Sequence, residues 1–489
     1  MICVVIKGPS YEEAYQQISK ALEYADLIEI RLDAFTCLNL DKLKELRSFF
    51  SIPMIFTLRS QAEGGSYRGS EEERLADIRS LCFLEPEYLD VEHRVPRSFI
   101  EEISSQFPYS QLILSHHDFI KTPDDLEGLY QEMKKTPAHF YKIAVTAHNA
   151  LDALRLISWS KQSDPRLIAI SMGLYGQLSR ILGPIMKCPI TYAALKEDQI
   201  TAPGQLSAKI LAECYHHHCL NPDTRIYGLI GDPVDQSISD KTHNFLFFAN
   251  GLNAVYVKIE IKSAELCDFF ALAKKGLFHG LSVTMPLKER VLPFVDEIDP
   301  EALAIGAVNT LLFEEGKVFG FNTDAIGALN AIEKKGEVKT KRIVIIGAGG
   351  ASKAIAYEAC RRGALVTVIS RDKEKGLQIA QRFNCQWKRV NEMTDVFDQE
   401  YDILINCTPD PLPISSSSIL PKSLVMDIKT NPKNTLLLTC ALEKNCRIVY
   451  GYEMFIEQAL GQFKLWFKQG LDADESRIIL KKKTEELIT

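Results

Sequence analysis

No hydrophobic run in this sequence of 489 residues reaches the roughly 20 residues that a membrane span requires. The chain also lacks a cluster of lysine and arginine, and its net charge of −7 disfavours binding to nucleic acid. A signal peptide is not expected, because the apolar stretch Ile2–Ile6 is too short and no cleavage site follows it. These absences predict a cytoplasmic protein without a membrane or nucleic-acid partner. The sequence carries no indication of an oligomeric state.

Disulfide and metal frameworks are missing as well. The 12 cysteines lack the spacing of a disulfide-rich domain, which predicts reduced thiols. The segment Cys214–Cys219 holds two cysteines and three histidines and looks like a metal-binding sequence. No second pair of ligands follows it at the spacing of a zinc finger, so we expect no metal.

Short β-rich apolar runs alternate with helical patterns, such as Tyr11–Tyr24 and Leu151–Lys161, through the first half of the chain. Eight strands alternating with helices in about 220 residues predict a (β/α)8 TIM barrel, which we place at residues 1–221. The expected strands are Ile2–Ile6, Leu27–Arg31, Met54–Leu58, Tyr88–Glu92, Leu112–His116, Tyr141–Val145, Leu167–Met172 and Ile190–Ala194.

A turn at Asn221–Asp223 ends this rhythm, and a second α/β region is expected over residues 222–489. It divides into two lobes. The first takes residues 222–325 together with C-terminal helices from about residue 453, which are expected to pack back on it. The second, residues 326–452, opens with Arg342–Gly350, a strand that leads into a glycine turn. Further strands are expected at Tyr227–Ile230, Ala254–Ile259, Gly280–Thr284 and Val308–Phe313, and the helices at Glu453–Phe467 and Ala473–Glu486.

Polar residues gather at the carboxyl ends of the predicted barrel strands, where such barrels place their catalytic groups. So many polar groups on one rim indicate a site for a small, charged, hydroxylated ligand. They are Glu29, Arg31, Thr57, Arg59, Asp90, Glu92, His116, His117, Asp118, Lys142, Ser171 and Arg180.

Lys142 lies inside the apolar segment Phe140–Val145, where a lysine is costly. Desolvation disfavours its ammonium form and leaves an amine that can attack a ketone, although an edge lysine that reaches solvent would fit the same pattern. His117 could take a proton from the carbon next to the resulting imine, and His116 is the competing candidate. Arg59 and Arg180 could bind a carboxylate, or could be surface arginines.

Seven segments in order resemble type I 3-dehydroquinate dehydratase over about residues 1–215. They are Glu29–Asp33, Phe56–Arg59 with Glu63–Gly65, His117–Phe119, Lys142–Val145, Ser171–Gly173, Ser179–Arg180 and Ala202–Gln205. The resemblance implies that Lys142 forms an imine, that His117 acts as base and then acid, and that Arg180 holds the substrate carboxylate. It also implies that the remaining residues orient hydroxyls or close a lid loop: Glu29, Arg31, Arg59, Thr201 and Gln205. His116 stands where the family often has tyrosine, and Thr201 where it often has serine.

The glycine turn after Ile343–Ile346 consists of Gly347, Ala348, Gly349, Gly350 and Ala351. Such a turn lets a pyrophosphate approach the backbone at a helix N-terminus, although an ordinary tight turn is the alternative.

About twenty residues later comes a short polar run of Ser370, Arg371, Asp372 and Lys373. Arg371 and Lys373 suit the 2′-phosphate of NADP, whereas Asp372 would suit the ribose hydroxyls of NAD. Because neighbouring side chains of an extended segment face apart, we expect Asp372 to point outward and NADP(H) to be preferred.

A second set of motifs resembles shikimate dehydrogenase over about residues 225–489. It comprises Gly231–Val234, Ser237–Ser239, His243–Asn244, Ser282–Lys288, Gly306–Thr310, Asn322–Asp324, the glycine turn, Asn406–Pro409, Gly451, Glu453–Met454 and Gln458. The resemblance implies that Lys288 and Asp324 are the catalytic pair, since a lysine and an aspartate can relay a proton to an alcohol oxygen. It assigns the carboxylate to Ser237 and Ser239, the ring hydroxyls to Thr284, Asn309 and Gln458, and further cofactor contacts to Thr408 and Gly451.

Five residues depart from the usual pattern of that family: Asp240, Ser282, Pro411, Leu412 and Thr430, the last where a substrate-contacting tyrosine is usual. They bear on substrate affinity and on the loops around the nicotinamide, and leave the reaction type unchanged.

The expected function is a two-step enzyme of aromatic amino acid biosynthesis. It dehydrates 3-dehydroquinate to 3-dehydroshikimate through a lysine Schiff base and then reduces that product to shikimate with NADPH. Three alternatives compete: quinate oxidation by the second half, a non-catalytic quinate-pathway regulator, and an aldolase fused to an unrelated dehydrogenase. Lys142, His117, Lys288 and Asp324 are all present, which favours the enzyme.

Overall fold

The computed structural model describes residues 1–196, 204–389, 401–468 and 471–488. The chain forms two compact units, one of Met1–Arg225 with Asn253–Glu260, the other of Ile226–Leu252 with Ile261–Thr489. In the described parts of the chain no helix combines the length and apolar character of a membrane span.

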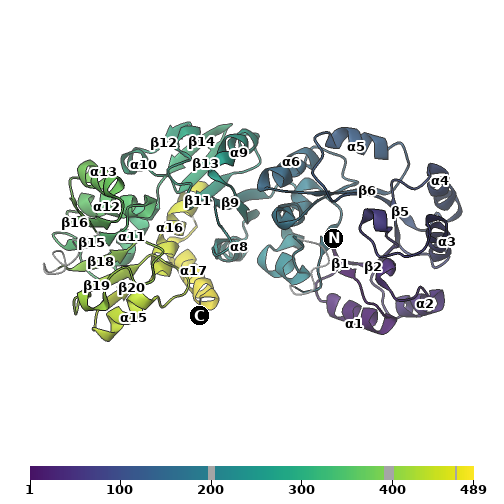
Figure 1. Cartoon of the computed structure of the whole chain (residues 1–489), viewed down its shortest axis with the longest axis horizontal. Helices are drawn as coiled ribbons and strands as arrows, with labels where there is room; N and C mark the ends of the chain where they lie inside the picture. Colours follow the sequence, from purple (N-terminus) through teal and green to yellow (C-terminus); the bar gives the residue numbers. More distant parts are fainter. Residues whose placement is uncertain (197–203, 390–400, 469–470, 489) are drawn as a thin grey trace. The chain divides into compact units, whose positions relative to one another are not determined.

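The first unit is built on an eight-stranded sheet in the order β7-β6-β5-β4-β3-β2-β1-β8, in which every strand pairs in parallel with its neighbour (Figure 1). β1 pairs with both β2 and β8, so the sheet curls into the predicted (β/α)8 barrel. The strands are β1 (Ile2–Ile6), β2 (Leu27–Arg31), β3 (Met54–Thr57), β4 (Tyr88–Glu92), β5 (Gln111–Asp118), β6 (Phe140–Thr146), β7 (Leu167–Met172) and β8 (Thr191–Ala193).

Helices cover the outside of the barrel, and polar caps fix where several begin (Figure 1). Ser10 accepts from the Glu13 amide, and Ser70 forms a reciprocal capping box with Glu73. The helices are α1 (Tyr11–Ala21), α2 (Leu40–Ser48), α3 (Glu71–Cys82), α4 (Arg97–Gln106), α5 (Leu126–Met133), α6 (Ala150–Ser160) and α7 (Gln177–Ile181).

Two local differences from the expectation bear on function. β5 continues to Asp118, so His117 lies within the strand and pairs in register with Ala144 of β6. The segment Cys214–Cys219 is not one continuous helix, because His216 adopts a left-handed conformation between a π-helix and a 3-10 turn.

Besides the barrel sheet, the chain has two six-stranded sheets. The first has the order β10-β9-β11-β13-β14-β12 and mixes parallel with antiparallel pairs. Its strands are β9 (Arg225–Gly231), β10 (Ala254–Glu260), β11 (Gly280–Val283), β12 (Glu297–Ile298), β13 (Thr310–Glu314) and β14 (Lys317–Phe321), and its helices are α8 (Ser239–Ala249), α9 (Leu266–Ala273), α10 (Pro300–Ile305) and α11 (Asp324–Glu333).

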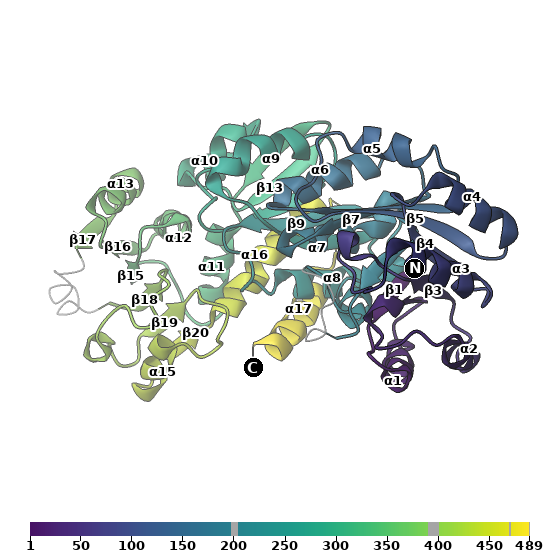
Figure 2. The same ribbon diagram turned by 45° about the vertical axis from the view of Figure 1, so that its right-hand side comes forward.

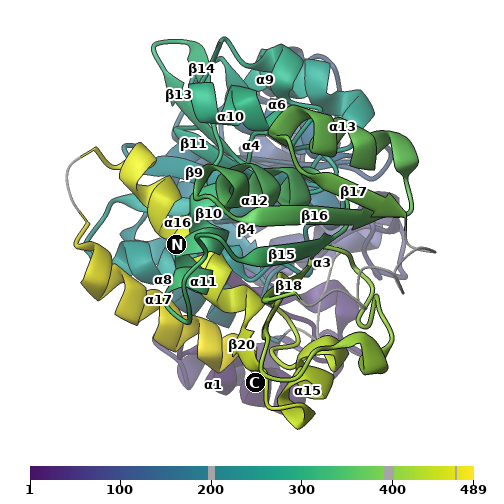
Figure 3. The same cartoon turned by 90° about the vertical axis from the view of Figure 1, so that its left-hand side faces the viewer.

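The other sheet is parallel throughout, in the order β17-β16-β15-β18-β19-β20 (Figure 3). This is the doubly wound arrangement of a dinucleotide-binding domain, with the reversal of strand order between β15 and β18. Its elements are β15 (Arg342–Ile346), α12 (Gly350–Arg361), β16 (Leu365–Ser370), α13 (Lys373–Phe383), β17 (Gln386–Arg389), β18 (Ile403–Asn406), β19 (Leu424–Asp427), α15 (Leu436–Glu443) and β20 (Arg447–Val449).

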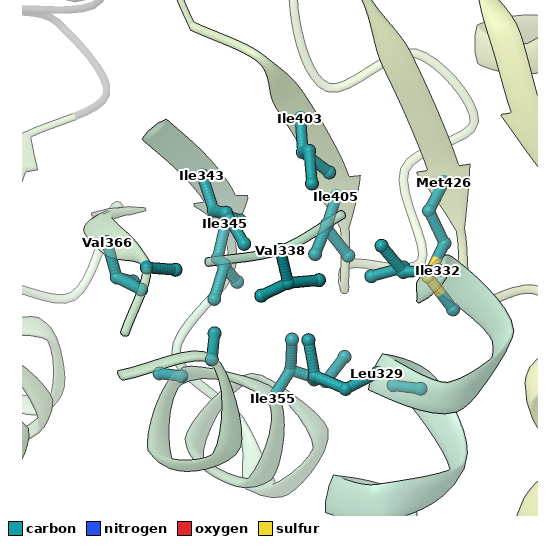
Figure 4. Close-up of a cluster of buried hydrophobic side chains, with 14 of the residues drawn as sticks. Leu329, Ile332, Val338, Ile343, Ile345, Ile355, Val366, Ile403, Ile405 and Met426 are labelled. Carbon is teal, nitrogen blue, oxygen red and sulfur yellow. The ribbon is translucent and has the colours of Figure 1, made fainter. Parts of the chain in front are cut away.

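One face of this parallel sheet packs on α11 and α12 through branched aliphatic side chains (Figure 4). Ile345 and Ile405 of the central strands meet Leu329 and Ile355 of the helices, and all four side chains are fully buried. Burial of this kind stabilises the lobe by roughly 1.5–3 kcal/mol for each large aliphatic side chain. The packed face sets the sheet against the helix that follows the glycine turn.

The predicted C-terminal helices are α16 (Gly451–Trp466) and α17 (Ala473–Leu487), shown in yellow in Figure 2. α16 packs back on the first lobe, as expected: the Ser282 hydroxyl donates to Gln462 at 3.0 Å, and the Trp466 indole donates to the Leu311 carbonyl at 3.0 Å. The end of the chain thereby helps to shape the first lobe.

Candidate active sites

Lys142 lies in the middle of β6 and is 4% exposed. Its Nζ is 3.2 Å from Asp90 Oδ2 and 3.5 Å from Glu29 Oε1, and it lies 4.0 Å from the centre of the Tyr192 ring. The sequence suggested apolar surroundings, but β2 and β4 turn carboxylates toward this lysine. Its ammonium is therefore buried with compensating charge.

His117 pairs with a buried carboxylate. Its Nδ1 is 2.9 Å from Glu63 Oε2, and its ring stacks on Phe119. Burial lowers the pKa of His117 well below its usual range, and the cations of Arg59 and Lys142 add to this effect. Burial also raises the pKa of Glu63 to about 7, against the opposing effect of Arg59. A neutral imidazole held through Nδ1 keeps Nε2 for a reacting proton.

His116 points to the opposite side of β5. In register, Ser115 pairs with Lys142 and His117 with Ala144, so these side chains alternate with that of His116. The His116 ring instead packs edge-on against His93, with centroids 5.9 Å apart. The strand geometry therefore separates the two histidine candidates and brings only His117 to the side of Lys142.

Arg59 is surrounded by acids. Its guanidinium donates to Asp90 at 2.7 Å and to the Ser115 hydroxyl at 2.7 Å, and it lies 3.8 Å from Glu63 and 3.7 Å from Glu92. Burial would raise the pKa of Asp90, but Arg59 and Lys142 together hold it at about 2. Arg59 thus keeps the carboxylate beside Lys142 ionised.

Arg180 is a buried cation without an acidic partner in the described part of the chain. Its Nη1 donates to the carbonyls of Ser171 at 2.7 Å and Gly176 at 3.2 Å, and its Nε has no hydrogen-bond partner. Burial lowers its pKa to about 10, so it remains charged at neutral pH. A buried and uncompensated guanidinium suits the carboxylate of a substrate.

The other predicted contacts of the barrel occupy its rim. Glu29 accepts from the Thr57 hydroxyl at 2.9 Å, and Arg31 makes a two-point contact with Asp33. Gln205 is 6% exposed and follows Gly204, whose φ of +78° places its backbone against Gly173. Thr201 lies outside the described residues.

In the second unit, Lys288 and Asp324 form an ion pair. Asp324 is the first residue of α11 and is 4% exposed, and its second oxygen accepts from the Asn309 amide at 2.9 Å. The Asn309 amide is also within 3.3 Å of Gln458 Oε1 on α16, while its oxygen accepts from the Thr323 backbone at 2.8 Å. The predicted proton-transfer pair and two predicted hydroxyl ligands are therefore one connected network.

The predicted carboxylate ligands and a further predicted hydroxyl ligand come from other elements of this unit. The hydroxyls of Ser237 and Ser239 are 2.8 Å apart at the start of α8. Thr284 follows β11, and its methyl group lies against Gly231. Ser282 donates to Gln462, so this departure from the usual asparagine joins the strand to α16.

The glycine turn has the geometry that the sequence predicts. Gly347 has a φ of +116°, a conformation that favours glycine, and Gly349 caps the first turn of α12. A Cβ on Gly349 would meet nothing within 4 Å, whereas one on Gly350 would lie 3.4 Å from Lys288. The turn therefore leaves room for a pyrophosphate beside a helix N-terminus and lies next to Lys288.

The polar run after β16 divides by orientation. Arg371, Asp372 and Lys373 are all exposed, and the Asp372 side chain accepts from the Lys375 amide at 3.0 Å and caps α13. The Ser370 hydroxyl is turned inward, where it accepts from the Trp387 indole at 2.9 Å. Arg371 and Lys373 therefore offer two cations to solvent at this strand end, while Asp372 is hydrogen-bonded to the first turn of α13.

Thr408 and Gly451 lie at the carboxyl edge of the same sheet. The Thr408 hydroxyl donates to Asn406 at 2.8 Å, and Gly451 is buried at the start of α16. Within the four described ranges, which include the segment Cys214–Cys219, no group of three or more histidine, cysteine, aspartate or glutamate side chains could hold a metal ion.

Known families match successive parts of the chain. The family described as type I 3-dehydroquinase matches residues 2–221. The shikimate dehydrogenase substrate binding domain matches residues 229–311, and the family described as shikimate / quinate 5-dehydrogenase matches residues 330–440.

Relatives of similar length carry both parts. The "Shikimate biosynthesis protein AroDE" of Chlamydia pneumoniae is 36% identical over 468 residues, covering 96% of this chain and 95% of that protein. The "Bifunctional 3-dehydroquinate dehydratase/shikimate dehydrogenase, chloroplastic" of Arabidopsis thaliana is 35% identical over 494 residues, covering 95% of this chain and 82% of that one. The chain belongs to the bifunctional 3-dehydroquinate dehydratase/shikimate dehydrogenase family.

Solved structures match the dehydrogenase half of this bifunctional enzyme. A crystal structure of a shikimate dehydrogenase in complex with NADP+ is 34% identical, with a TM-score of 0.51, and covers 55% of this chain and 98% of that one. The predicted fold class, a barrel followed by a two-lobed dehydrogenase with a Rossmann-type sheet, is confirmed.

Several polar residues of the bifunctional enzyme's barrel had no role assigned from sequence. Asp90 and Glu92 are strand-end acids, and Glu63 is part of a Glu-Gly-Gly motif, but nothing in the sequence shows which partners they face. The usable signal is the number of acids on the other barrel strands and at their ends. Their number predicts compensation of a buried cation, which the structure shows through Asp90.

Proposed function

We infer that the chain catalyses two successive reactions: it dehydrates 3-dehydroquinate to 3-dehydroshikimate and reduces that product to shikimate with NADPH. The observation that carries this inference is that each unit holds a complete set of chemical groups. The barrel brings Lys142 beside acids, with His117 on Glu63 and the uncompensated Arg180. The second unit places the Lys288–Asp324 pair next to a glycine turn.

In the dehydratase step, we propose that the Lys142 amine attacks the substrate ketone and forms an imine with loss of water. The ammonium must first lose a proton, and we propose Glu29 as its acceptor, because Glu29 Oε1 lies 3.5 Å from Nζ. The imine acidifies the neighbouring carbon, and His117 removes the proton there. The same imidazolium then protonates the departing hydroxyl, and hydrolysis of the imine returns the amine.

Arg180 would hold the substrate carboxylate, because its burial and its free Nε favour an anionic partner. Glu29, Arg31 and Arg59 then face the hydroxylated side of the ring, and Gln205 contributes from the loop that follows β8. We keep Thr201 in this set as a prediction from the sequence alone.

In the reductase step, bound NADPH would supply a hydride to the carbonyl carbon. Lys288 would donate a proton to the oxygen that becomes the alcohol, and its ion pair with Asp324 would hold the ammonium in place. Asn309 orients Asp324, and Gln458 and Thr284 serve the ring hydroxyls. Ser237 and Ser239 would bind the carboxylate through neutral hydroxyls.

The residues of the cofactor site fit NADPH. Gly347 to Ala351 leave a pyrophosphate site at the α12 N-terminus, while Arg371 and Lys373 offer exposed cations for a 2′-phosphate. Asp372 is engaged as a helix cap, which favours NADP(H) over NAD(H). Thr408 and Gly451 would flank the nicotinamide end.

We propose that the activities divide at about residue 221, with the dehydratase at 1–221 and the dehydrogenase at 222–489, the latter of a substrate lobe and an NADP lobe that begins near residue 326. All twelve cysteines are free thiols, which suits a cytoplasmic enzyme.

Cutting the chain at Asn221–Pro222 should yield one dehydratase and one dehydrogenase fragment. Two inactive fragments would argue against self-sufficient units.

A coupled assay tests the proposal directly. The purified chain, given 3-dehydroquinate and NADPH, should form shikimate and consume one NADPH for each substrate. Lys142→Met should stop this conversion but leave 3-dehydroshikimate reduction intact, and Lys288→Met should cause 3-dehydroshikimate to accumulate. Absence of shikimate with the unmodified chain would support a regulator, and oxidation of quinate in preference to shikimate would reassign the second half.

A further inference from the structure

Asn406 and Asp427 form a buried polar pair at the carboxyl ends of the adjacent strands β18 and β19. They are register partners, and the Asn406 amide donates to the Asp427 carboxylate at 3.3 Å. Asn406 is 0% exposed and Asp427 is 1% exposed. Burial of an amide and a carboxylate in an aliphatic sheet is costly unless their polar atoms are hydrogen-bonded, so the contacts of this pair show what it holds in place.

Asn406 fixes the loop that follows β18. Its side-chain oxygen accepts from the Thr408 backbone at 2.9 Å and from the Thr408 hydroxyl at 2.8 Å, while its amide also donates to the Asp410 carbonyl at 3.0 Å. Thr408 in turn abuts the glycine turn: a Cβ on Gly347 would lie 3.2 Å from its methyl group. Asn406 therefore sets the position of the loop beside the pyrophosphate site.

Asp427 fixes the loop that follows β19. Its second oxygen accepts from the Lys429 backbone at 3.1 Å. The Lys429 carbonyl lies against Gly451, where a Cβ would approach it to 2.3 Å. Asp427 thus sets the position of the backbone against which α16 begins, and α16 carries Gln458 of the substrate network.

We propose that Asn406 and Asp427 are a positioning pair that fixes the nicotinamide side of the cofactor site relative to Lys288 and Asp324. This inference rests on the proposed reductase function. A sheet of this order binds one nucleotide on each half, across the carboxyl ends of its strands. Arg371 follows β16 and belongs to the adenosine half, which leaves the loops after β18 and β19 to the nicotinamide half.

The consequence is a separation of binding from rate. The affinity for the cofactor comes from the glycine turn and from Arg371, which the pair does not contact. The angle and distance of hydride transfer depend on the two loops, which it does contact. These same loops contain Pro411, Leu412 and Thr430, which depart from the usual family pattern. The pair therefore holds two loops whose sequence differs from that of the family.

The test is Asp427→Asn, which keeps the volume and places two amide groups against each other. A displacement of the order of 1 Å in reacting groups costs about 100-fold in rate, so the reductase kcat should fall about 10- to 100-fold. The KM for NADPH should stay within about threefold, because its anchors are unchanged. The dehydratase activity of the same molecules should be unaffected.

The matched control is Asp402→Asn, at the opposite end of β18, where the aspartate also accepts from a backbone amide. It should leave both activities unchanged. Thr408→Val provides a milder variant that removes one hydrogen bond without disturbing the buried charge, and it should lower kcat less than Asp427→Asn. The double exchange Asn406→Asp with Asp427→Asn restores an amide–carboxylate bond and should recover part of the lost kcat.

A wild-type kcat in both Asp427→Asn and Thr408→Val would overturn the positioning role. So would a rise in the KM for NADPH equal to the fall in kcat, because that pattern shows a lost grip. If the unmodified chain does not reduce 3-dehydroshikimate with NADPH, the proposed reductase function fails instead, and the two failures are thereby distinguished.

Discussion

The two active sites differ in how they hold charge. In the barrel, Lys142 and Arg59 are buried with Asp90 and Glu63, so cations and carboxylates touch at short range. In the dehydrogenase unit, one ion pair between Lys288 and Asp324 is surrounded by neutral hydrogen-bonding groups. The difference follows from the source of the reactive group.

Under the proposed mechanism, the barrel makes its own nucleophile and its own base from side chains, so it needs charges that move protons on and off Lys142 and His117. The dehydrogenase would obtain its reactive hydride from a cofactor, so its residues need only to align two molecules and supply one proton. The comparison therefore links dense buried charge to the unit for which we propose covalent chemistry. Variants of both sites can test that contrast, and those of the barrel should show the larger effects.

Lys142→Met should abolish dehydration, because the proposed imine forms on the amine of this lysine. The cavity keeps a side chain of similar length, and the reductase half of the same molecule serves as the control for folding. Turnover of 3-dehydroquinate and of 3-dehydroshikimate are measured separately. Residual dehydration within about tenfold of wild type would exclude covalent catalysis by this lysine.

His117→Ala should lower dehydratase turnover by about 10²- to 10⁴-fold, the range expected for a lost general base. His116→Tyr is the matched variant on the same strand, and it should keep close to wild-type turnover because its side chain faces away from Lys142. The reverse pattern in steady-state assays would show that the proton is moved from the other face of β5.

Glu63 should impose a pH dependence on dehydration. Its pKa is raised to about 7 by burial, so above that pH it is ionised and accepts a hydrogen bond from the Nδ1–H of His117. Below that pH a protonated Glu63 donates to Nδ1 and removes the basic tautomer. We expect kcat/KM to rise with pH through about 7 and then level off. Glu63→Gln should lower the plateau and remove this limb; survival of the limb at the same midpoint would assign it to another group.

Arg371→Ala should have the smallest effect, a rise in the KM for NADPH of about tenfold or less, because an exposed contact with a phosphate contributes modestly. The KM for NADH should barely change. The control is Lys375→Ala, because Lys375 is another exposed cation in the first turn of α13 and lies beside Asp372. An unmodified enzyme that favours NADH at equal concentration would reverse the assignment and make Asp372 the selector.

Much of the fold is predictable from the sequence because strand composition and turn residues agree locally. The strands at Ile2–Ile6, Leu27–Arg31, Tyr88–Glu92 and Leu167–Met172 have the predicted limits. The extension of β5 to Asp118 was missed, because histidines and an aspartate are poor strand formers and only pairing with β6 holds them extended.

The partners of the site residues were less predictable than the residues themselves. Lys142 stands out by its place in an apolar strand, but its contacts with Asp90 and Glu29 come from strands that are distant in sequence. The partner of Asp372 is another such contact. The alternation of side chains along a strand predicts that Asp372 points outward, but its hydrogen bond as the cap of α13 depends on where that helix begins. Pairing across the fold, rather than residue type, decides these contacts.

Borohydride trapping tests the contrast between the two units most directly. Sodium borohydride added with 3-dehydroquinate should reduce the imine and leave a stable mass adduct on the peptide that contains Lys142. No adduct should form in Lys142→Met, and none should form in the dehydrogenase half of the unmodified chain. Trapping on another lysine, or full dehydratase turnover with no adduct anywhere, would contradict both the covalent mechanism and its link to the buried charge of the barrel.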